Sequence, residues 1–168
     1  MNYWIIQSNP KYFDILRWLK EIFASSGDKA LTDRYYISCY KPEVKPGDTV
    51  FIWKCKGNGN IRGIYAKGTV EPVPVPDKWP LCDKEREFCV GQRGRDDLEK
   101  MRRNRKTIAV KYISFHLNER EPLLEDEIKK KPELRDLTIF KQGEVRRGIH
   151  KVAPEKCRVI ESLLSQHR

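Results

Sequence analysis

The stretch Val50–Val70, VFIWKCKGNGNIRGIYAKGTV, limits the possible folds of this chain more than any other segment. Two runs rich in β-branched and aromatic residues, 50–53 and 61–70, are separated by glycines and asparagines at 57–60. An Asn-Gly pair between two such runs is the strongest short-range signal for a β-hairpin. We therefore expect two neighbouring antiparallel strands, the second ended by the prolines at 72, 74 and 76.

The glycines of this hairpin do not predict a nucleotide-triphosphate site. The segment lacks the Gly-Lys-Ser/Thr ending of a phosphate-binding loop and leads into a strand. Without a helix N-terminus behind the loop there is no helix dipole to hold a phosphate.

Further strands and helices are expected on both sides of the hairpin. Apolar runs predict strands at 3–6, 35–37 and 108–115. Helical spacing of apolar residues over 12–23 predicts a helix that Asn9 caps and Pro10 opens, and a second helix begins at Pro154. Together these elements indicate an α+β fold in which a mixed, strongly curved sheet closes into a small barrel flanked by helices.

The 168 residues fit a single domain, 1–168, with a charged surface excursion at about 81–106 that is partly disordered or helical near 96–103. The net charge of +10 favours polyanions through the release of their condensed counterions. Nucleic acid is therefore the leading partner class, and a solvated basic surface is the alternative. Five cysteines without metal spacing, no apolar run of membrane-spanning length and no signal peptide predict a cytoplasmic protein with no membrane contact.

No sequence motif indicates catalysis or a cofactor. The histidines His116, His150 and His167 are far apart and have no companion acidic cluster, which argues against a metal site. Neither a serine elbow nor a recognisable cysteine nucleophile is present, so we expect no enzyme, no cofactor and no metal.

Four short motifs in order resemble the EVE domain, a family of the PUA-like superfamily related to the YTH domain. They are YWIIQSNP at 3–10, VKPGDTVFIW at 44–53, GIYAKG at 63–68, and KQG at 141–143 followed by VAPE at 152–155. The resemblance implies a PUA-like pseudo β-barrel with a pocket at one end. YTH domains hold a flipped N6-methyladenine there in an aromatic cage, and EVE domains are thought to read modified bases in the same way.

Carried over residue by residue, the resemblance implies a base-binding pocket. Ser8 and Asn9 match the serine and asparagine that lie along the base edge, although Asn9 as a plain helix cap is an equal alternative. Tyr35 or Tyr36 stands where the family has a tryptophan, and Trp79, in a proline-rich loop, resembles the second cage tryptophan. Trp53 is interpreted as either pocket wall or core. The phosphate-binding candidates are Arg146, Arg147, His150 and Lys151 before the last helix, and Lys54, Lys56 and Arg62 on the hairpin.

We therefore expect a non-catalytic module that reads a modified base, such as a methylated one, in DNA or RNA by base flipping, with a restriction or RNA-processing protein as a further partner. One alternative is an ASCH-type amidohydrolase of the same superfamily acting on acylated cytidine. It would use Lys67, Thr69 and Glu71, which alternate along one strand and share a face. The other is a general RNA or protein interaction module that docks through 81–106.

Overall fold

The computed structural model describes residues 1–25, 32–37, 43–56, 61–72, 84–104, 106–117, 122–140 and 148–166. Its strands are β1 (Tyr3–Ser8), β2 (Thr32–Ile37), β3 (Thr49–Lys54), β4 (Gly63–Val70), β5 (Lys106–Phe115), β6 (Leu123–Leu124) and β7 (Ile149–Val152). The α-helices are α1 (Ile15–Ser25), α2 (Gly91–Asn104), α3 (Glu125–Lys130) and α4 (Pro154–Gln166). Three short 3-10 helices complete the described elements: η1 (Lys84–Phe88), η2 (Pro132–Leu134) and η3 (Thr138–Phe140).

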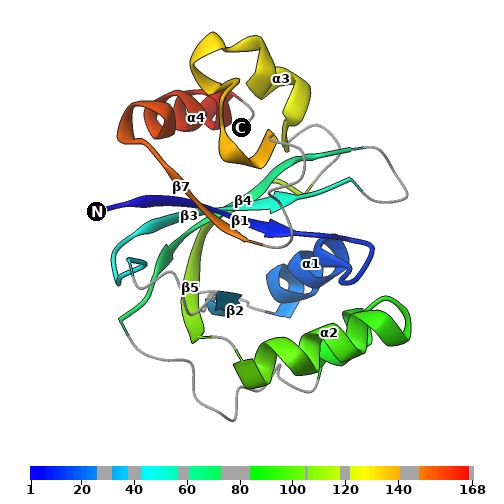
Figure 1. The fold of residues 1–168 in the computed structure, drawn as a ribbon. Coiled ribbons are helices and arrows are strands. Elements are labelled where there is room, and N and C mark those ends of the chain that lie inside the picture. The colour runs from blue at the N-terminus through cyan, green and yellow to red at the C-terminus, as the bar shows by residue number, and fades with distance from the viewer. Residues whose placement is uncertain are drawn as a thin grey trace.

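The strands form one curled, seven-stranded sheet in the order β2-β5-β4-β3-β1-β7, with β6 paired to β4. β1 runs parallel to β3, whereas the other paired strands are antiparallel. In Figure 1, α3 and α4 lie above the sheet and α1 and α2 lie below it. This arrangement confirms the predicted α+β class and the curved mixed sheet flanked by helices.

The predicted hairpin is formed by β3 and β4, which pair from Thr49 opposite Thr69 to Lys54 opposite Gly63. The register shifts by one residue between Ile52 and Trp53, which marks a bulge of the kind that bends a strand. The connecting residues 57–60 lie outside the described part of the chain. The bulge adds to the curl of the sheet at the end of β3 that lies nearest the end of β1.

The central strands of the sheet are buried on both faces, and their alternate residues enter two separate cores. Trp4 and Val50 pack in the core with α1, whereas Ile5 and Phe51 pack in the core with α4. Successive strand residues point to opposite faces, so a strand covered on both sides needs apolar residues at every position. This explains why the first apolar run of the hairpin is continuous rather than alternating.

The carboxylate of Asp48 joins the chain start to the turn that precedes β3. It accepts hydrogen bonds from the Asn2 amide at 2.7 Å, the Trp4 indole at 2.9 Å and the Lys45 amide at 3.1 Å. Burial by itself would raise the pKa of Asp48, but these donors outweigh burial and hold the pKa below its ordinary value. Asp48 therefore stabilises the fold in its charged form.

We expect Asp48→Asn to lower the free energy of unfolding by about 2 kcal/mol at pH 7, because an amide nitrogen would face backbone and indole donors. Urea denaturation measures this loss. The exposed Glu87→Gln is the control and should change the free energy of unfolding by less than about 0.5 kcal/mol.

The hydrogen bonds to the Asp48 carboxylate also make the free energy of unfolding depend on pH. A carboxyl group whose pKa is lower in the folded state stabilises the fold above its unfolded pKa, here near 3.8, and that stabilisation is lost as the pH falls further. The gap in unfolding free energy between the wild type and Asp48→Asn should therefore narrow below about pH 4. A gap that stays constant down to pH 2 would show that the ionised form is not the stabilising one.

The charged segment 81–106 is more ordered than the sequence suggested. Its described residues form η1 and α2, and the predicted helix at 96–103 is the second half of α2. Residues 81–83 and 105 lie outside the described ranges. None of the described helices combines the length and the apolar sequence that a membrane span requires.

Candidate functional site

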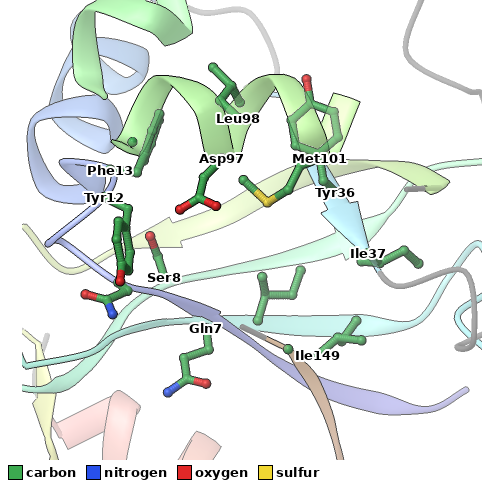
Figure 2. A pocket seen from close by; sticks show the side chains of 14 residues that line it. Gln7, Ser8, Tyr12, Phe13, Tyr36, Ile37, Asp97, Leu98, Met101 and Ile149 are labelled. Atoms are coloured by element: carbon green, nitrogen blue, oxygen red, sulfur yellow. The ribbon is translucent and has the colours of Figure 1, made fainter. Parts of the chain in front are cut away.

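A pocket of about 100 Å³ opens where β1 ends, between the start of the α1 segment, β2 and α2 (Figure 2). Ser8 and Asn9 supply polar groups from the end of β1, and Tyr12 and Tyr36 supply rings. The remaining wall is largely apolar and comes from β1, β2, β7 and α2, with Asp97 among the α2 residues. A concave, mostly apolar site with a few convergent polar groups is the usual form of a small-ligand pocket.

The turn after β1 brings Asn9 and Tyr12 to the pocket. The Asn9 side-chain oxygen accepts a hydrogen bond from the Lys11 amide at 3.0 Å, and the Asn9 carbonyl accepts one from the Tyr12 amide at 3.0 Å. The predicted helix cap at Asn9 is therefore wrong, since α1 begins only at Ile15. Asp14 takes that role, because its carboxylate accepts from the Arg17 amide at 3.2 Å.

Helix α2 closes the pocket from the side opposite β1. The Tyr12 carbonyl accepts a hydrogen bond from the Val90 amide at 2.9 Å, just before α2 begins. A Cβ atom on Gly94 would lie 2.3 Å from the Tyr12 carbonyl oxygen, so only glycine permits this approach. The first turn of α2 is therefore seated directly on the backbone of the pocket turn.

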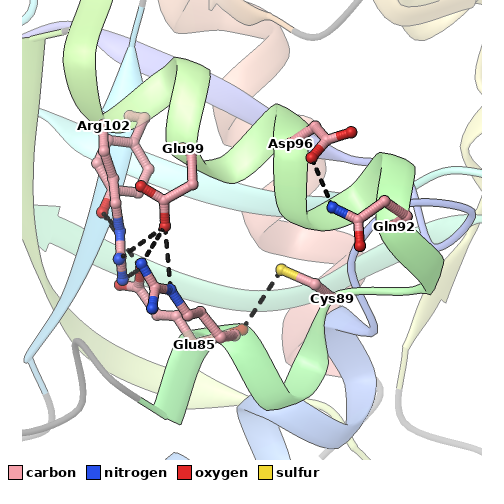
Figure 3. A network of polar contacts seen from close by, with 8 residues as sticks. Glu85, Cys89, Gln92, Asp96, Glu99 and Arg102 are labelled. Atoms are coloured by element: carbon pink, nitrogen blue, oxygen red, sulfur yellow. Dashed lines mark hydrogen bonds and ion pairs between the residues drawn. The ribbon is translucent and has the colours of Figure 1, made fainter.

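An ion-pair network holds the other end of α2 (Figure 3). Arg102 donates to Glu85 of η1 at 3.1 Å and to the Tyr36 hydroxyl of β2 at 3.3 Å, and Tyr36 in turn donates to Glu85 at 3.2 Å. Burial raises the pKa of Glu85, and Arg102 and Tyr36 counteract it. The network fixes the ring of Tyr36 at the pocket wall.

A second cavity of about 120 Å³ adjoins the pocket, shares Ser8 and Tyr36 with it, and reaches Asp33 and Tyr35. Asp33 is 1% exposed and accepts hydrogen bonds from the Tyr112 hydroxyl at 2.7 Å and the Trp18 indole at 3.0 Å. Burial raises the pKa of Asp33 to about 6, although both donors favour the charged form. The hydroxyl groups of Tyr35 and Tyr112 lie 2.5 Å apart, which ties Tyr35 into this buried chain.

The structure brings four of the six predicted base-binding residues to these two cavities, namely Ser8, Asn9, Tyr35 and Tyr36. Trp53 is not among them. It is 2% exposed and packs on Phe140 at 5.8 Å between ring centroids, in the core on the α4 side of the sheet. The alternation of β3 explains this correction, because Ile52 takes the pocket-side face and Trp53 the opposite one. Trp79 lies outside the described residues, so its role stays a prediction.

The predicted phosphate-binding residues lie in separate places. Lys54 is 8% exposed and its ammonium donates to the Ile61 carbonyl at 2.7 Å, so it does not fit a phosphate contact. Arg62 pairs with Glu125 at 3.2 Å, whereas Lys56 is exposed. His150 lies 3.4 Å from the Gln7 side chain of β1, and Lys151 pairs with Glu43 at 3.1 Å. Arg146 and Arg147 lie outside the described residues.

Sequence reasoning missed the contribution of α2 and of Tyr12. Gly94, Asp97, Leu98 and Met101 line the pocket from a helix whose sequence is dominated by charge. Two apolar residues on one face, Leu98 and Met101, were the available signal. Arg93, with its guanidinium 5.2 Å from the Tyr12 ring centroid, adds a cation beside the pocket.

Among the described residues, no group of three or more histidine, cysteine or acidic side chains could hold a metal ion. The groups that line the pocket are hydroxyl, amide, carboxylate and ring, together with aliphatic side chains and Met101. These groups can stack on a flat ligand and hydrogen-bond to its edge.

A curled mixed sheet with helices on both faces and a pocket at the end of its first strand is the PUA-like fold. The family model of the EVE domain matches residues 2–163, and the chain therefore belongs to the EVE domain family.

Three solved structures illustrate the relationship. Human THYN1 in complex with 5-methylcytosine-containing DNA is 15% identical over 98% of each chain, with a TM-score of 0.60. Protein PSPTO5229 from Pseudomonas syringae is 17% identical over 96% of this chain and 99% of its own, with a TM-score of 0.60. A ZmASCH protein from Zymomonas mobilis is 13% identical over 97% and 99%, with a TM-score of 0.50. At these identities the likeness establishes the fold. A search of curated protein sequences finds no match.

We expect Gly94→Ala to displace α2 and to destabilise the protein by about 1–3 kcal/mol, because the new methyl group meets a backbone oxygen that no rotamer change can move. Helix propensity alone predicts the opposite, since alanine is about 1 kcal/mol better than glycine in a helix interior. Thermal or urea unfolding decides between the two. Arg95→Ala, at an exposed position of the same helix, is the control and should change stability by less than about 0.5 kcal/mol.

Proposed function

We propose that this protein is a non-catalytic reader of a modified base in nucleic acid, and that it takes the base, flipped out of its stack, into the pocket at the end of β1. The observation that carries the proposal is the convergence of Ser8, Asn9, Tyr12 and Tyr36 on one cavity in an EVE domain. The complex of human THYN1 with 5-methylcytosine-containing DNA supports the same class of ligand.

The rings of Tyr12 and Tyr36 supply stacking surfaces on different sides of the pocket (Figure 2). Stacking of a base on an aromatic ring contributes about 1–3 kcal/mol, which offsets the few kcal/mol needed to extrude the base. Trp79 is proposed as a further stacking residue on the strength of the family resemblance alone. The Ser8 hydroxyl and the Asn9 amide supply the donors and acceptors that a base edge requires.

The apolar part of the pocket suits a methyl group. Leu98 and Met101 of α2 and Ile149 of β7 line it, and Leu98 and Ile149 are largely buried already. Burying one methyl group contributes about 0.8 kcal/mol, which corresponds to roughly a fourfold gain in affinity. Preference for a methylated base over its unmodified parent is therefore expected to be modest from this contact alone.

Binding should be measured with short DNA and RNA oligonucleotides that carry cytosine or 5-methylcytosine at one central position. We expect the methylated base to bind at least about fourfold tighter by fluorescence anisotropy at constant salt. Tyr12→Ala should weaken binding of the methylated oligonucleotide by roughly tenfold through lost stacking.

Tyr12→Phe is the matched variant, because it keeps the ring and should bind within about twofold of the wild type. The same titration with N6-methyladenine tests the other base that the family resemblance suggests. If modified and unmodified oligonucleotides bind equally for both bases, the protein does not read base modification.

The ASCH-type alternative would use Lys67, Thr69 and Glu71, and of these three Lys67 lines a cleft apart from the pocket. Lys67 forms an ion pair with Glu161 of α4 and lines a small cleft with Ser114 and His116. The Ser114 hydroxyl lies 3.2 Å from His116 Nε2 in the same cleft. Because Lys67 is already paired and the cleft is only about 50 Å³, we favour the binding function.

Incubation with N4-acetylcytidine separates the two functions. A reader leaves the nucleoside unchanged on chromatography, and we expect this result for the wild type. Release of cytidine by the wild type, and its loss in Lys67→Ala, would instead identify an amidohydrolase.

A further inference from the structure

Asp97 places a carboxylate inside the pocket. It lies on α2, is half-buried, and in Figure 2 extends from the helix toward the space above Ser8. Its neighbours Leu98 and Met101 line the same wall, so the carboxylate lies beside apolar side chains. A polar group in such surroundings contributes strongly to which ligands are accepted.

The adjacent residue Asp96, by contrast, does not line the pocket. Asp96 is exposed and accepts a hydrogen bond from Gln92 at 2.8 Å on the outer side of α2 (Figure 3). One residue along a helix turns the side chain by about 100°. The same helix therefore presents one carboxylate to solvent and one to the pocket, and the two can be compared directly.

The described residues that line the pocket include no lysine or arginine, but positive charge lies beside it. The guanidinium of Arg93 lies over the Tyr12 ring, and Arg95 is exposed one turn before Glu99 on α2. Phosphates are attracted to such cations, whereas a carboxylate repels them. Within a chain of net charge +10, the carboxylate that lines the pocket is suited to the base and not to the backbone.

Bases differ in the chemical groups that they present to a hydrogen-bond acceptor. Cytosine and adenine carry an exocyclic amino group, which donates hydrogen bonds, whereas thymine, uracil and guanine carry a carbonyl oxygen at the corresponding ring position. An ionised carboxylate only accepts, and its two oxygens offer about four acceptor positions, so Asp97 can accept from a ligand while it keeps other contacts. A carbonyl oxygen opposite Asp97 would leave two acceptors facing each other.

We propose that Asp97 is a specificity-determining residue that makes this pocket select bases with an amino group at position 4 of a pyrimidine or position 6 of a purine, and that it does so by accepting a hydrogen bond from that group. The inference rests on the proposed function of the pocket and adds to it the class of base that is read. It assigns to the charged segment 81–106 a direct part in ligand choice.

5-Methylcytosine and thymine form the sharpest test pair, because both carry the 5-methyl group and they differ at ring positions 3 and 4. With single-stranded oligonucleotides that differ only at one central base, we expect the wild type to bind 5-methylcytosine at least about tenfold tighter than thymine. Asp97→Asn should reduce this ratio to less than about threefold, because a side-chain amide can turn to offer either a donor or an acceptor.

Asp96→Asn removes the same charge from the same helix and should leave the ratio unchanged. Any general gain in affinity from the lost negative charge appears equally in both variants. Circular dichroism melting checks that each variant is folded, and the wild-type ratio tests the proposal without any substitution.

The outcomes are distinguishable. If the wild type prefers 5-methylcytosine to cytosine but binds thymine as tightly as 5-methylcytosine, Asp97 does not select the amino group and the reader function stands. The same conclusion follows if Asp97→Asn keeps the wild-type ratio of affinities for 5-methylcytosine and thymine. If cytosine, 5-methylcytosine and thymine all bind alike, both the inference and a cytosine-reading function fail.

Discussion

The parallel pairing of β1 with β3 sets the position of everything that lines the pocket. It runs through six residue pairs, from Tyr3 opposite Thr49 to Ser8 opposite Lys54, in the interior of the sheet. Because β1 is buried on both faces, a slip by one residue would exchange its two core faces and move Ser8 away from the cavity. The carboxylate of Asp48, bonded to Asn2 and Trp4, reinforces this register from the other end of the strand.

Most of the sheet could be predicted from local sequence, because strands buried on one or both faces leave a clear pattern of apolar and β-branched residues. The hairpin of β3 and β4 and the helix that begins at Pro154 follow directly from such patterns. The side of the sheet that each residue faces could not be predicted for β3, where every position from Val50 to Trp53 is apolar. For this reason Trp53 had two interpretations, pocket wall or core. The structure assigns it to the core.

The candidate site was predictable only in part, because its far wall depends on a long-range contact. The motif at the end of β1 identified Ser8 and Asn9, and the tyrosines of β2 stood where the family has a ring. Nothing local in a strongly charged helix shows that Gly94 rests on the carbonyl of Tyr12, a contact between residues far apart in sequence. The charge pattern predicted a surface excursion that is partly disordered or helical, and it described only the outer face of α2 correctly.

Helix α2 lines the pocket, although it is not part of the sheet that supports the pocket. It lies between β4 and β5 in the chain and meets the pocket through the Tyr12 backbone and the Glu85–Arg102–Tyr36 network. The residues that hold the sheet together and the α2 residues that line the pocket therefore lie in different segments, so a substitution on the pocket face of α2 leaves the central strands of the sheet untouched.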